Sequence, residues 1–250
     1  MSCARVGTEP LDVDSNVDAQ RARAIGAALE RVAVPLLALR NGRAEPLASG
    51  ALYLFGTSIL LLTCRHLFDD GVSVGDLGLP LGDSGRILWL REARARVLVD
   101  PAADLAAVRI GCRRCAGLLR RHWRAASFDS LASEAGVRTY VLAGFPYAQM
   151  RRVGAVLHAR PVVVFARGDL EAGQLKVSYR RIARRVDGLE IHAPALDGVS
   201  GATLWALIEG GGEVECVLQP AAVQSSFKHD AYVRAEPVGA FFRLLQSRLG

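Results

Sequence analysis

Three short segments, in the chain order histidine, aspartate, serine, carry side chains that together could perform nucleophilic catalysis. His66 follows an apolar run, Asp104 stands directly before another, and Ser200 lies one residue before Gly201. A serine hydroxyl is a weak nucleophile and needs a neutral imidazole to accept its proton. The imidazole needs an acid on its other ring nitrogen, which fixes the tautomer and stabilises the imidazolium. We therefore interpret Ser200 as a nucleophile, His66 as its general base and Asp104 as the residue that orients the histidine.

The glycines beside the serine suit a tight turn that gathers backbone N–H donors. Glycine adopts backbone conformations that are closed to other residues, and donors already in place stabilise the oxyanion of an acyl transfer. The predicted donors are the N–H groups of Gly198 and Ser200. The serine turn of the α/β-hydrolases does not fit, because Ala202 replaces its last glycine and because its chain order ends on histidine.

Each of these residues also has a simpler interpretation. Taken alone, Ser200 could be a turn serine, His66 a hydrogen-bonded core histidine and Asp104 a turn or capping residue. Asp69 and Asp100 are rival acids for the histidine. We favour Asp104 because an apolar strand follows it directly. We favour catalysis because three suitable segments occur together in the chain order histidine, aspartate, serine on an all-β background.

The elements that position these residues are predicted to be short strands. Runs rich in Val, Leu and aromatic residues alternate with Gly, Pro, Asp and Asn at short intervals, which is typical of an all-β sandwich or barrel. Residues 17–31 mix alanine with spaced charges, so we expect a short helix there. A second helix is expected at 238–249, where four apolar residues share one face: Phe241, Leu244, Leu245 and Leu249.

The catalytic segments resemble the trypsin-like (chymotrypsin-fold) serine peptidases, most closely the bacterial members without disulfides. The motifs are T-x-x-H ending at His66, D-L-A-x-V beginning at Asp104, and G-x-S-G around Ser200. Ser49-Gly50 resembles the strand opening before the histidine, and Gly144-Phe145-Pro146 resembles a turn early in the second barrel. The resemblance runs from about residue 32 to 235.

This resemblance implies two antiparallel six-stranded β-barrels packed face to face, with a C-terminal helix against the second. The implied divisions are a partly helical N-terminal extension at 1–31 and a peptidase domain at 32–250, with barrels at about 32–125 and 135–235 and the helix at 238–249. It implies a serine endopeptidase that cleaves a protein or peptide substrate through an acyl-enzyme, without a metal or an organic cofactor. The substrate would lie between the barrels.

The same resemblance bears on specificity, activation and activity. It places two substrate-binding residues: Pro194, six residues before the nucleophile, at the floor of the specificity pocket, and Asp197 at its rim. Val199 stands where zymogen-type relatives carry an aspartate that pairs with a newly cut N-terminus, so we expect no activation by N-terminal cleavage. Cys64-Arg65 replaces a usually small pair before the histidine, and Ala202-Thr203 replaces a usual Gly-Pro. An inactive or latent fold that binds peptides therefore remains the alternative function.

Composition sets the class of protein and its expected partners. Hydrophobic residues make up 51% and charged residues 22% of the chain, and the net charge is +6, which is a globular composition. Arginines cluster at 113–124 and 180–185, but too few aromatic residues lie among them for a nucleic-acid stacking platform. We expect no nucleic-acid partner, although a basic nucleic-acid-binding barrel remains a third alternative, and we leave a regulatory partner open.

The remaining expectations concern membranes, cysteines and metals. The apolar stretch 46–64 is broken by glycines, and 1–16 lacks the apolar core of a secretory signal; we expect a cytoplasmic protein without a membrane anchor. The odd number of cysteines argues against a disulfide framework. Cys112-x-x-Cys115 could be half of a zinc site, but no second pair has ligand spacing, so no metal site is predicted.

Overall fold

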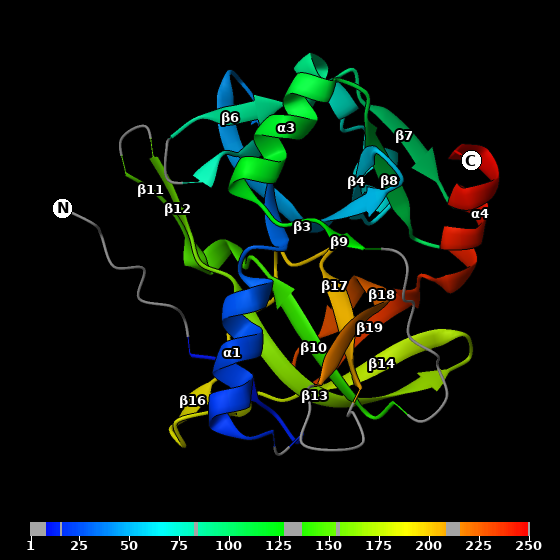
Figure 1. The fold of residues 1–250 in the computed structure, drawn as a ribbon. Helices are drawn as coiled ribbons and strands as arrows, with labels where there is room; N and C mark the ends of the chain where they lie inside the picture. Colours follow the sequence, from blue (N-terminus) through cyan, green and yellow to red (C-terminus); the bar gives the residue numbers. More distant parts are fainter. Residues whose placement is uncertain are drawn as a thin grey trace.

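The computed structural model of the chain describes residues 9–15, 17–82, 85–127, 137–153, 156–208 and 216–249. About half of these residues lie in strands, which form two β units (Figure 1). Strands within residues 33–127 make the upper unit in that view, and most strands within residues 139–237 make the lower one. None of the helices in the described ranges is long and apolar enough to cross a membrane.

The first unit is an open sheet in the order β6-β5-β2-β3-β4-β8-β7, with β9 pairing alongside β3. Among the described residues, the end strands β6 and β7 each have a partner on one side only, so the sheet forms a half-barrel. Its strands are β2 (Ala33–Arg40), β3 (Arg43–Phe55), β4 (Ser58–Thr63), β5 (Leu77–Pro80), β6 (Ile87–Trp89), β7 (Arg96–Val99), β8 (Ala106–Ile110) and β9 (Ala126–Ser127). Its helical segments are α2 (His66–Asp69), η1 (Val74–Asp76), η3 (Leu90–Ala93) and α3 (Arg113–His122).

The second unit contains a closed antiparallel barrel of six strands. The order is β10-β17-β18-β19-β14-β13, and β13 returns to pair with β10. The six strands are β10 (Thr139–Gly144), β13 (Val162–Glu171), β14 (Gln174–Tyr179), β17 (Thr203–Ile208), β18 (Val217–Lys228) and β19 (Ala231–Pro237). Strand β14 alternates buried and half-buried residues along its length, as expected where one face of a strand lines a barrel interior.

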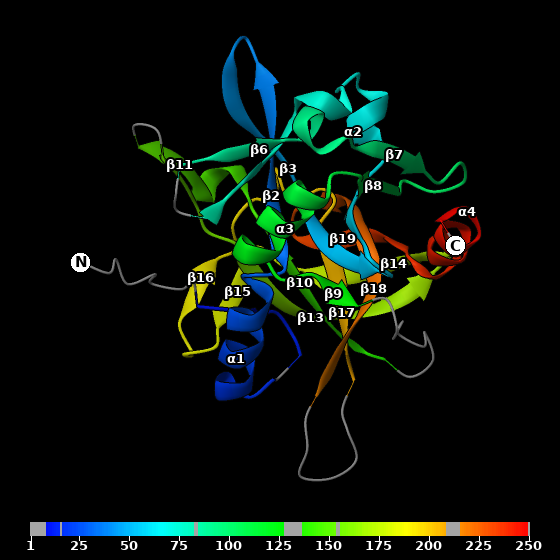
Figure 2. The ribbon, with the colours of Figure 1, turned by 45° about the horizontal axis from the view of Figure 1, so that its top comes forward.

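Shorter elements surround the barrel. Strand β1 pairs with β13 on one side and with β15 on the other, and β15 pairs in turn with β16, while β11 and β12 form a separate hairpin. Strand β16 lies beside helix α1 in both ribbon views (Figures 1 and 2). These elements are β1 (Leu11–Asp12), α1 (Ala19–Leu29), η4 (Tyr147–Gln149), β11 (Met150–Val153), β12 (Val156–Ala159), β15 (Ile182–Arg185), β16 (Glu190–His192) and α4 (Gly239–Leu249).

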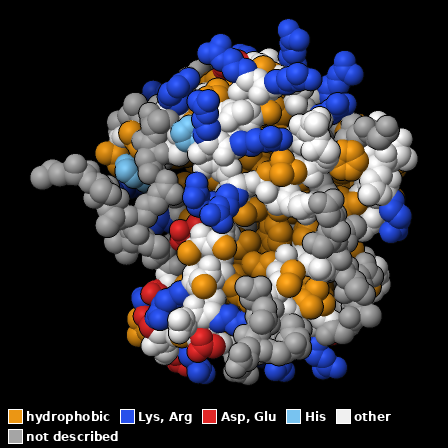
Figure 3. All heavy atoms as spheres, viewed as in Figure 1, with side chains coloured by type: hydrophobic (Ala, Val, Ile, Leu, Met, Phe, Trp, Pro, Cys, Tyr) orange, Lys and Arg blue, Asp and Glu red, His pale blue; other side chains and the backbone are white. Residues whose placement is uncertain are grey.

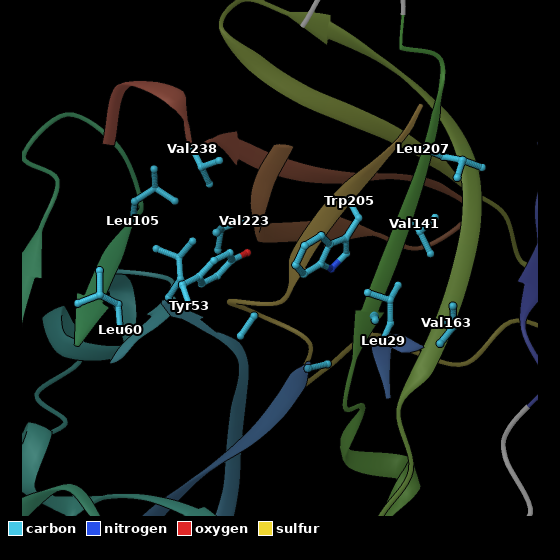
Figure 4. Packing of buried hydrophobic residues seen from close by; sticks show 14 of the residues in the cluster. Leu29, Tyr53, Leu60, Leu105, Val141, Val163, Trp205, Leu207, Val223 and Val238 are labelled. Carbon is cyan, nitrogen blue, oxygen red and sulfur yellow. The ribbon is translucent and has the colours of Figure 1, made fainter. Parts of the chain in front are cut away.

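The two units share a core. One cluster of buried apolar residues lies within the barrel, one lies in the first sheet, and a third joins the two units (Figure 4). At the centre of the third cluster, the rings of Tyr53 on β3 and Trp205 on β17 stack with centroids 6.1 Å apart. The Tyr53 hydroxyl also forms a hydrogen bond of 2.9 Å with Thr203 Oγ1. The units are therefore packed in a fixed relation to each other.

The structure confirms a mostly β fold with one closed six-stranded barrel and a C-terminal helix, but two closed barrels are not seen. The first sheet ends on β6 and β7, which have three and four residues, and a strand this short offers few backbone groups for closure. The C-terminal helix α4 was expected to pack on the second barrel. Its Phe241, Phe242 and Leu245 belong to the shared core, which contains residues of both units, and the centroid of the Phe242 ring lies 6.1 Å from that of the Tyr53 ring on the first sheet.

Candidate active site

His66 and Asp104 are brought together by two adjacent strands of the first sheet. Strands β4 and β8 pair antiparallel, with Thr63 opposite Ala106, so the end of one strand lies beside the start of the other. One carboxylate oxygen of Asp104 lies 2.7 Å from His66 Nδ1, and the other accepts the His66 backbone N–H at 2.8 Å. The aspartate thus fixes both the ring and the backbone of the histidine.

The two rival acids have other contacts. A carboxylate oxygen of Asp100 accepts the backbone N–H of Ala102 at 2.8 Å. Asp69 pairs with Arg65, whose Nε lies 3.1 Å from its carboxylate. Among the three candidate acids, the hydrogen bond to the histidine ring comes from Asp104.

The environment of His66 favours its charged form. The hydrogen bond to Asp104 is the largest influence and the hydrogen bond to Cys64 the next; together they outweigh burial and raise the pKa of His66 to about 10. This exceeds the ordinary histidine pKa of about 6.5 that a bare general base would have. With Nδ1 held by Asp104, Nε2 is the nitrogen that can exchange a proton with a nucleophile.

A cysteine occupies the neighbourhood of that nitrogen. The Sγ atom of Cys64 lies 3.5 Å from His66 Nε2, and burial is the largest of the influences that raise the pKa of this thiol. In the described residues the Nε2 partner is this thiol, and the Ser200 hydroxyl makes no hydrogen bond there. The sequence signal for the contact was the replacement of a usually small residue by Cys64.

The serine turn is docked against the first sheet close to His66. The backbone N–H of Ser49 on β3 donates to the carbonyl of Ser200 at 2.8 Å. The Ser49 hydroxyl donates to the carbonyl of Gly198 and accepts the N–H of Phe145, both at 2.9 Å. Ser49 therefore joins the turn that carries Ser200 to the sheet that carries His66.

Gly201 makes this approach close. A Cβ atom built on Gly201 would lie 2.1 Å from Thr63 Oγ1, 2.3 Å from the carbonyl oxygen of Ser49 and 3.1 Å from the backbone nitrogen of Cys64. Its φ of +88° also lies in the region that favours glycine. The residue that follows Ser200 is thus in direct contact with the strand that leads to His66.

The predicted oxyanion donors are free in the described structure. The carbonyl of Asp197 accepts the N–H of Tyr147 at 2.8 Å. Because the described chain has no cis peptide bond, the N–H of Gly198 points away from that carbonyl. Neither this N–H nor that of Ser200 donates to another described residue, so both can receive an oxyanion.

The two predicted substrate-binding residues lie on the segment that leads into this turn. The carbonyl of Pro194 accepts a hydrogen bond from the Tyr179 hydroxyl, and burial raises the pKa of Tyr179 above its usual range. Pro194 is half-buried, whereas Asp197 is exposed. Asp197 belongs to the turn that carries Ser200, and Pro194 precedes that turn.

One polar residue beside the turn was not predicted. Gln224 on β18 accepts the N–H of Gly201 and donates to the carbonyl of Ala202 through its backbone, each at 2.8 Å. Its side chain is fully buried, and both polar atoms of the amide lack a hydrogen-bond partner among the described residues. A buried amide without partners costs free energy, and the apolar surroundings of Gln224 in the sequence did not signal its position.

Cysteines and possible metal ligands complete the description. The cysteines of the described residues, Cys64, Cys112, Cys115 and Cys216, are free thiols, and Cys3 lies outside those residues. The described ranges hold no group of three or more His, Cys, Asp or Glu side chains that could bind a metal ion.

Comparison with known proteins gives no further guide to the site. No protein-family model matches the chain, and a search of the curated proteins also gave no match.

Proposed function

We propose that this chain is a cytoplasmic serine endopeptidase that hydrolyses peptide bonds through an acyl-enzyme on Ser200. The observation that carries the proposal is the docking of the serine turn, through Ser49 and Gly201, against the strand that delivers a histidine already paired with an aspartate. This arrangement is similar to that of the trypsin-like peptidases. We further propose that the half-barrel is the counterpart of their first barrel.

In the proposed reaction the Ser200 hydroxyl attacks the carbonyl carbon of the peptide bond. His66 Nε2 accepts the hydroxyl proton, and the Asp104 carboxylate stabilises the imidazolium that forms. The oxyanion accepts hydrogen bonds from the N–H groups of Gly198 and Ser200, which are free to donate. The imidazolium then protonates the leaving amine, and a water molecule activated by the same imidazole hydrolyses the acyl-enzyme.

Two features favour a low activity at neutral pH. The lone pair of Nε2 must be released from Cys64 before it can receive the serine proton, and the imidazole must lose the proton that its raised pKa retains. The catalytically latent peptide-binding fold is therefore the second candidate function. The two candidates differ in whether Ser200 can be acylated at any pH.

Labelling with a fluorophosphonate, which phosphonylates activated serines with loss of fluoride, tests the proposal. The full chain is treated at neutral and alkaline pH, and the modified residue is located by peptide mass spectrometry. We expect labelling of Ser200 that increases with pH and is abolished by Ser200→Ala and by His66→Ala. Ser247, an exposed serine of α4 whose hydroxyl donates to Leu244, provides the matched control, since Ser247→Ala should leave labelling unchanged.

Absence of labelling at every pH in a folded chain would support the latent fold. Labelling of Ser200 that survives His66→Ala would contradict the role of His66 as general base.

A further inference from the structure

Two thiols that take no part in the proposed peptidase reaction, those of Cys112 and Cys115, lie at the start of α3. Cys112 is the residue directly before the helix and has no side-chain cap of its own. Cys115 lies in the first helical turn, and its thiol donates to the carbonyl of Glu92 at 3.5 Å. The two thiols are close enough to influence each other's pKa, lowering that of Cys112 and raising that of Cys115. Side chains three residues apart at a helix start are neighbours, as the short Cα separation of a disulfide requires.

The two thiols have opposite environments. Cys112 is partly exposed, and hydrogen bonds from the backbone N–H and the thiol of Cys115 lower its pKa most, with smaller contributions from the Arg114 N–H and the charge of Arg94. Cys115 is buried, and burial, the thiol of Cys112 and the charge of Glu92 raise its pKa to about 11. An accessible thiol whose pKa is lowered at a helix N-terminus near a cation forms the nucleophilic thiolate more readily than an ordinary cysteine, whereas the buried Cys115 thiol holds its proton more tightly.

Arginines surround this pair. A cavity of about 230 Å³ is lined by Arg94, Arg96, Arg109 and Gly111, and Gly111 is the residue before Cys112. Arg96 and Arg109 stand opposite each other on β7 and β8. None of the three arginines has an ion-pair partner among the described residues. Figure 3 shows Lys and Arg side chains gathered over the upper part of the molecule, where Figure 1 places α3.

We propose that Cys112 and Cys115 form a redox-active dithiol that exchanges with anionic low-molecular-weight disulfides, whose carboxylates bind the arginines of the adjacent cavity. Three guanidinium groups without acidic partners attract a negatively charged ligand. Guanidinium groups bind carboxylates through paired hydrogen bonds. The carboxylates would hold the disulfide next to Cys112.

The exchange proceeds in two steps. The Cys112 thiolate attacks one sulfur of the small disulfide, the S–S bond breaks, and the first thiol leaves with a proton from solvent. Cys115 then loses its proton and attacks Sγ of Cys112, and the second thiol leaves with that proton. The dithiol is oxidised by two electrons to an intramolecular disulfide, and the small disulfide is reduced to two thiols.

The experiment uses the full, reduced chain and oxidised glutathione, a disulfide with a net negative charge. Reactions are quenched with acid and mapped by mass spectrometry of the peptides. We expect the wild type to form the Cys112–Cys115 disulfide and Cys115→Ala to accumulate glutathione on Cys112. In Cys112→Ala neither product should form. Cys216, also partly exposed but outside a helix start, is the internal control and should react roughly tenfold more slowly than Cys112.

Charge selectivity is tested with Arg96→Gln combined with Arg109→Gln, two exposed positions. The double variant should react roughly fivefold more slowly with oxidised glutathione, while its rate with the neutral hydroxyethyl disulfide stays unchanged. Circular dichroism is measured as a control for the folding of each variant. A Cys112 that reacts no faster than Cys216 would overturn the dithiol. Equal slowing with both disulfides, or none, would overturn the anion site.

Discussion

The close approach of Gly201 to the first sheet makes Gly201→Ala a direct test of how the candidate site is assembled. The added methyl group would lie 2.1 Å from Thr63 Oγ1 and 2.3 Å from the carbonyl oxygen of Ser49. The Ser49 oxygen belongs to the backbone of β3, which cannot move without disturbing the sheet. The substitution should therefore push the serine turn away from the strand that leads to His66.

The expected loss of stability in Gly201→Ala has two parts. A left-handed backbone costs an L-residue about 1–2 kcal/mol, and the extra methyl group in a packed site adds about 1–3 kcal/mol. Gly188 separates the parts, because its φ of +93° resembles the +88° of Gly201 while nothing lies within 4 Å of a Cβ built there. Gly188→Ala should thus cost only the first part, about 1–2 kcal/mol.

The assay measures urea unfolding of both variants through Trp fluorescence, since Trp205 lies in the core that joins the two units. Gly201→Ala should be less stable than Gly188→Ala by about 1–3 kcal/mol. It should also lose the labelling of Ser200 under conditions in which both variants are folded. Equal destabilisation by the two substitutions would refute the contact between the serine turn and the first sheet.

Three further predictions concern the chemistry of the site. Asp104→Asn should lower turnover of a peptide substrate by about 10⁴-fold by presenting the wrong histidine tautomer, whereas Asp100→Asn should leave it within a few fold; the reverse result would reassign the acid. Because the base must be neutral and the pKa of His66 is raised to about 10, kcat/KM should be lost as pH falls and should still be rising above neutral pH. Cys64→Ala removes one cause of the raised pKa and should move this rise to lower pH. A wild-type profile that has already reached its plateau at neutral pH would contradict the raised pKa. Pro194, at the predicted pocket floor, offers no charge to a cationic side chain, whose unpaired burial is costly, and the nearby acid Asp197 is assigned to the exposed rim. A peptide-library profile should therefore not favour Arg or Lys before the cleaved bond, and a profile dominated by them would overturn the assignment.

The pairing of His66 with Asp104 could be predicted because each residue adjoins an apolar run. His66 ends one such run and Asp104 precedes another, and two buried strands that pair antiparallel place these ends together. The short apolar runs between turn residues also predicted an all-β sandwich or barrel, whereas closed six-stranded barrels were implied by the resemblance to the trypsin-like peptidases. What the residues themselves predicted is local, since a strand is recognised from its own residues.

Contacts between distant segments could not be predicted in the same way. Ser49 and Gly198 are 149 residues apart, and nothing in either segment specifies that one hydroxyl will join the two units. The open first sheet was missed because a strand of three residues, β6, is too short for its pattern to show whether it closes a barrel. Helix α3 was not predicted: the sequence showed only a cluster of arginines there, and because only Cys115 and Leu119 of its ten residues are buried, few positions carry the apolar period of a helix.

The position of the N-terminal segment bears on how the proposed peptidase could be controlled. Strand β1 is hydrogen-bonded between β13 and β15, and α1 buries Ile25 and Leu29 in the core that joins the two units. A segment built into the sheet in this way contributes to the stability of the fold. Val199, next to the proposed nucleophile Ser200, is fully buried among apolar residues of the barrel, where an unpaired ammonium group would be strongly penalised. A cut near residues 17–35 would therefore remove packing without supplying a partner for a new N-terminus. Control of the site is better sought at His66, where release of Cys64 from Nε2 would free the general base.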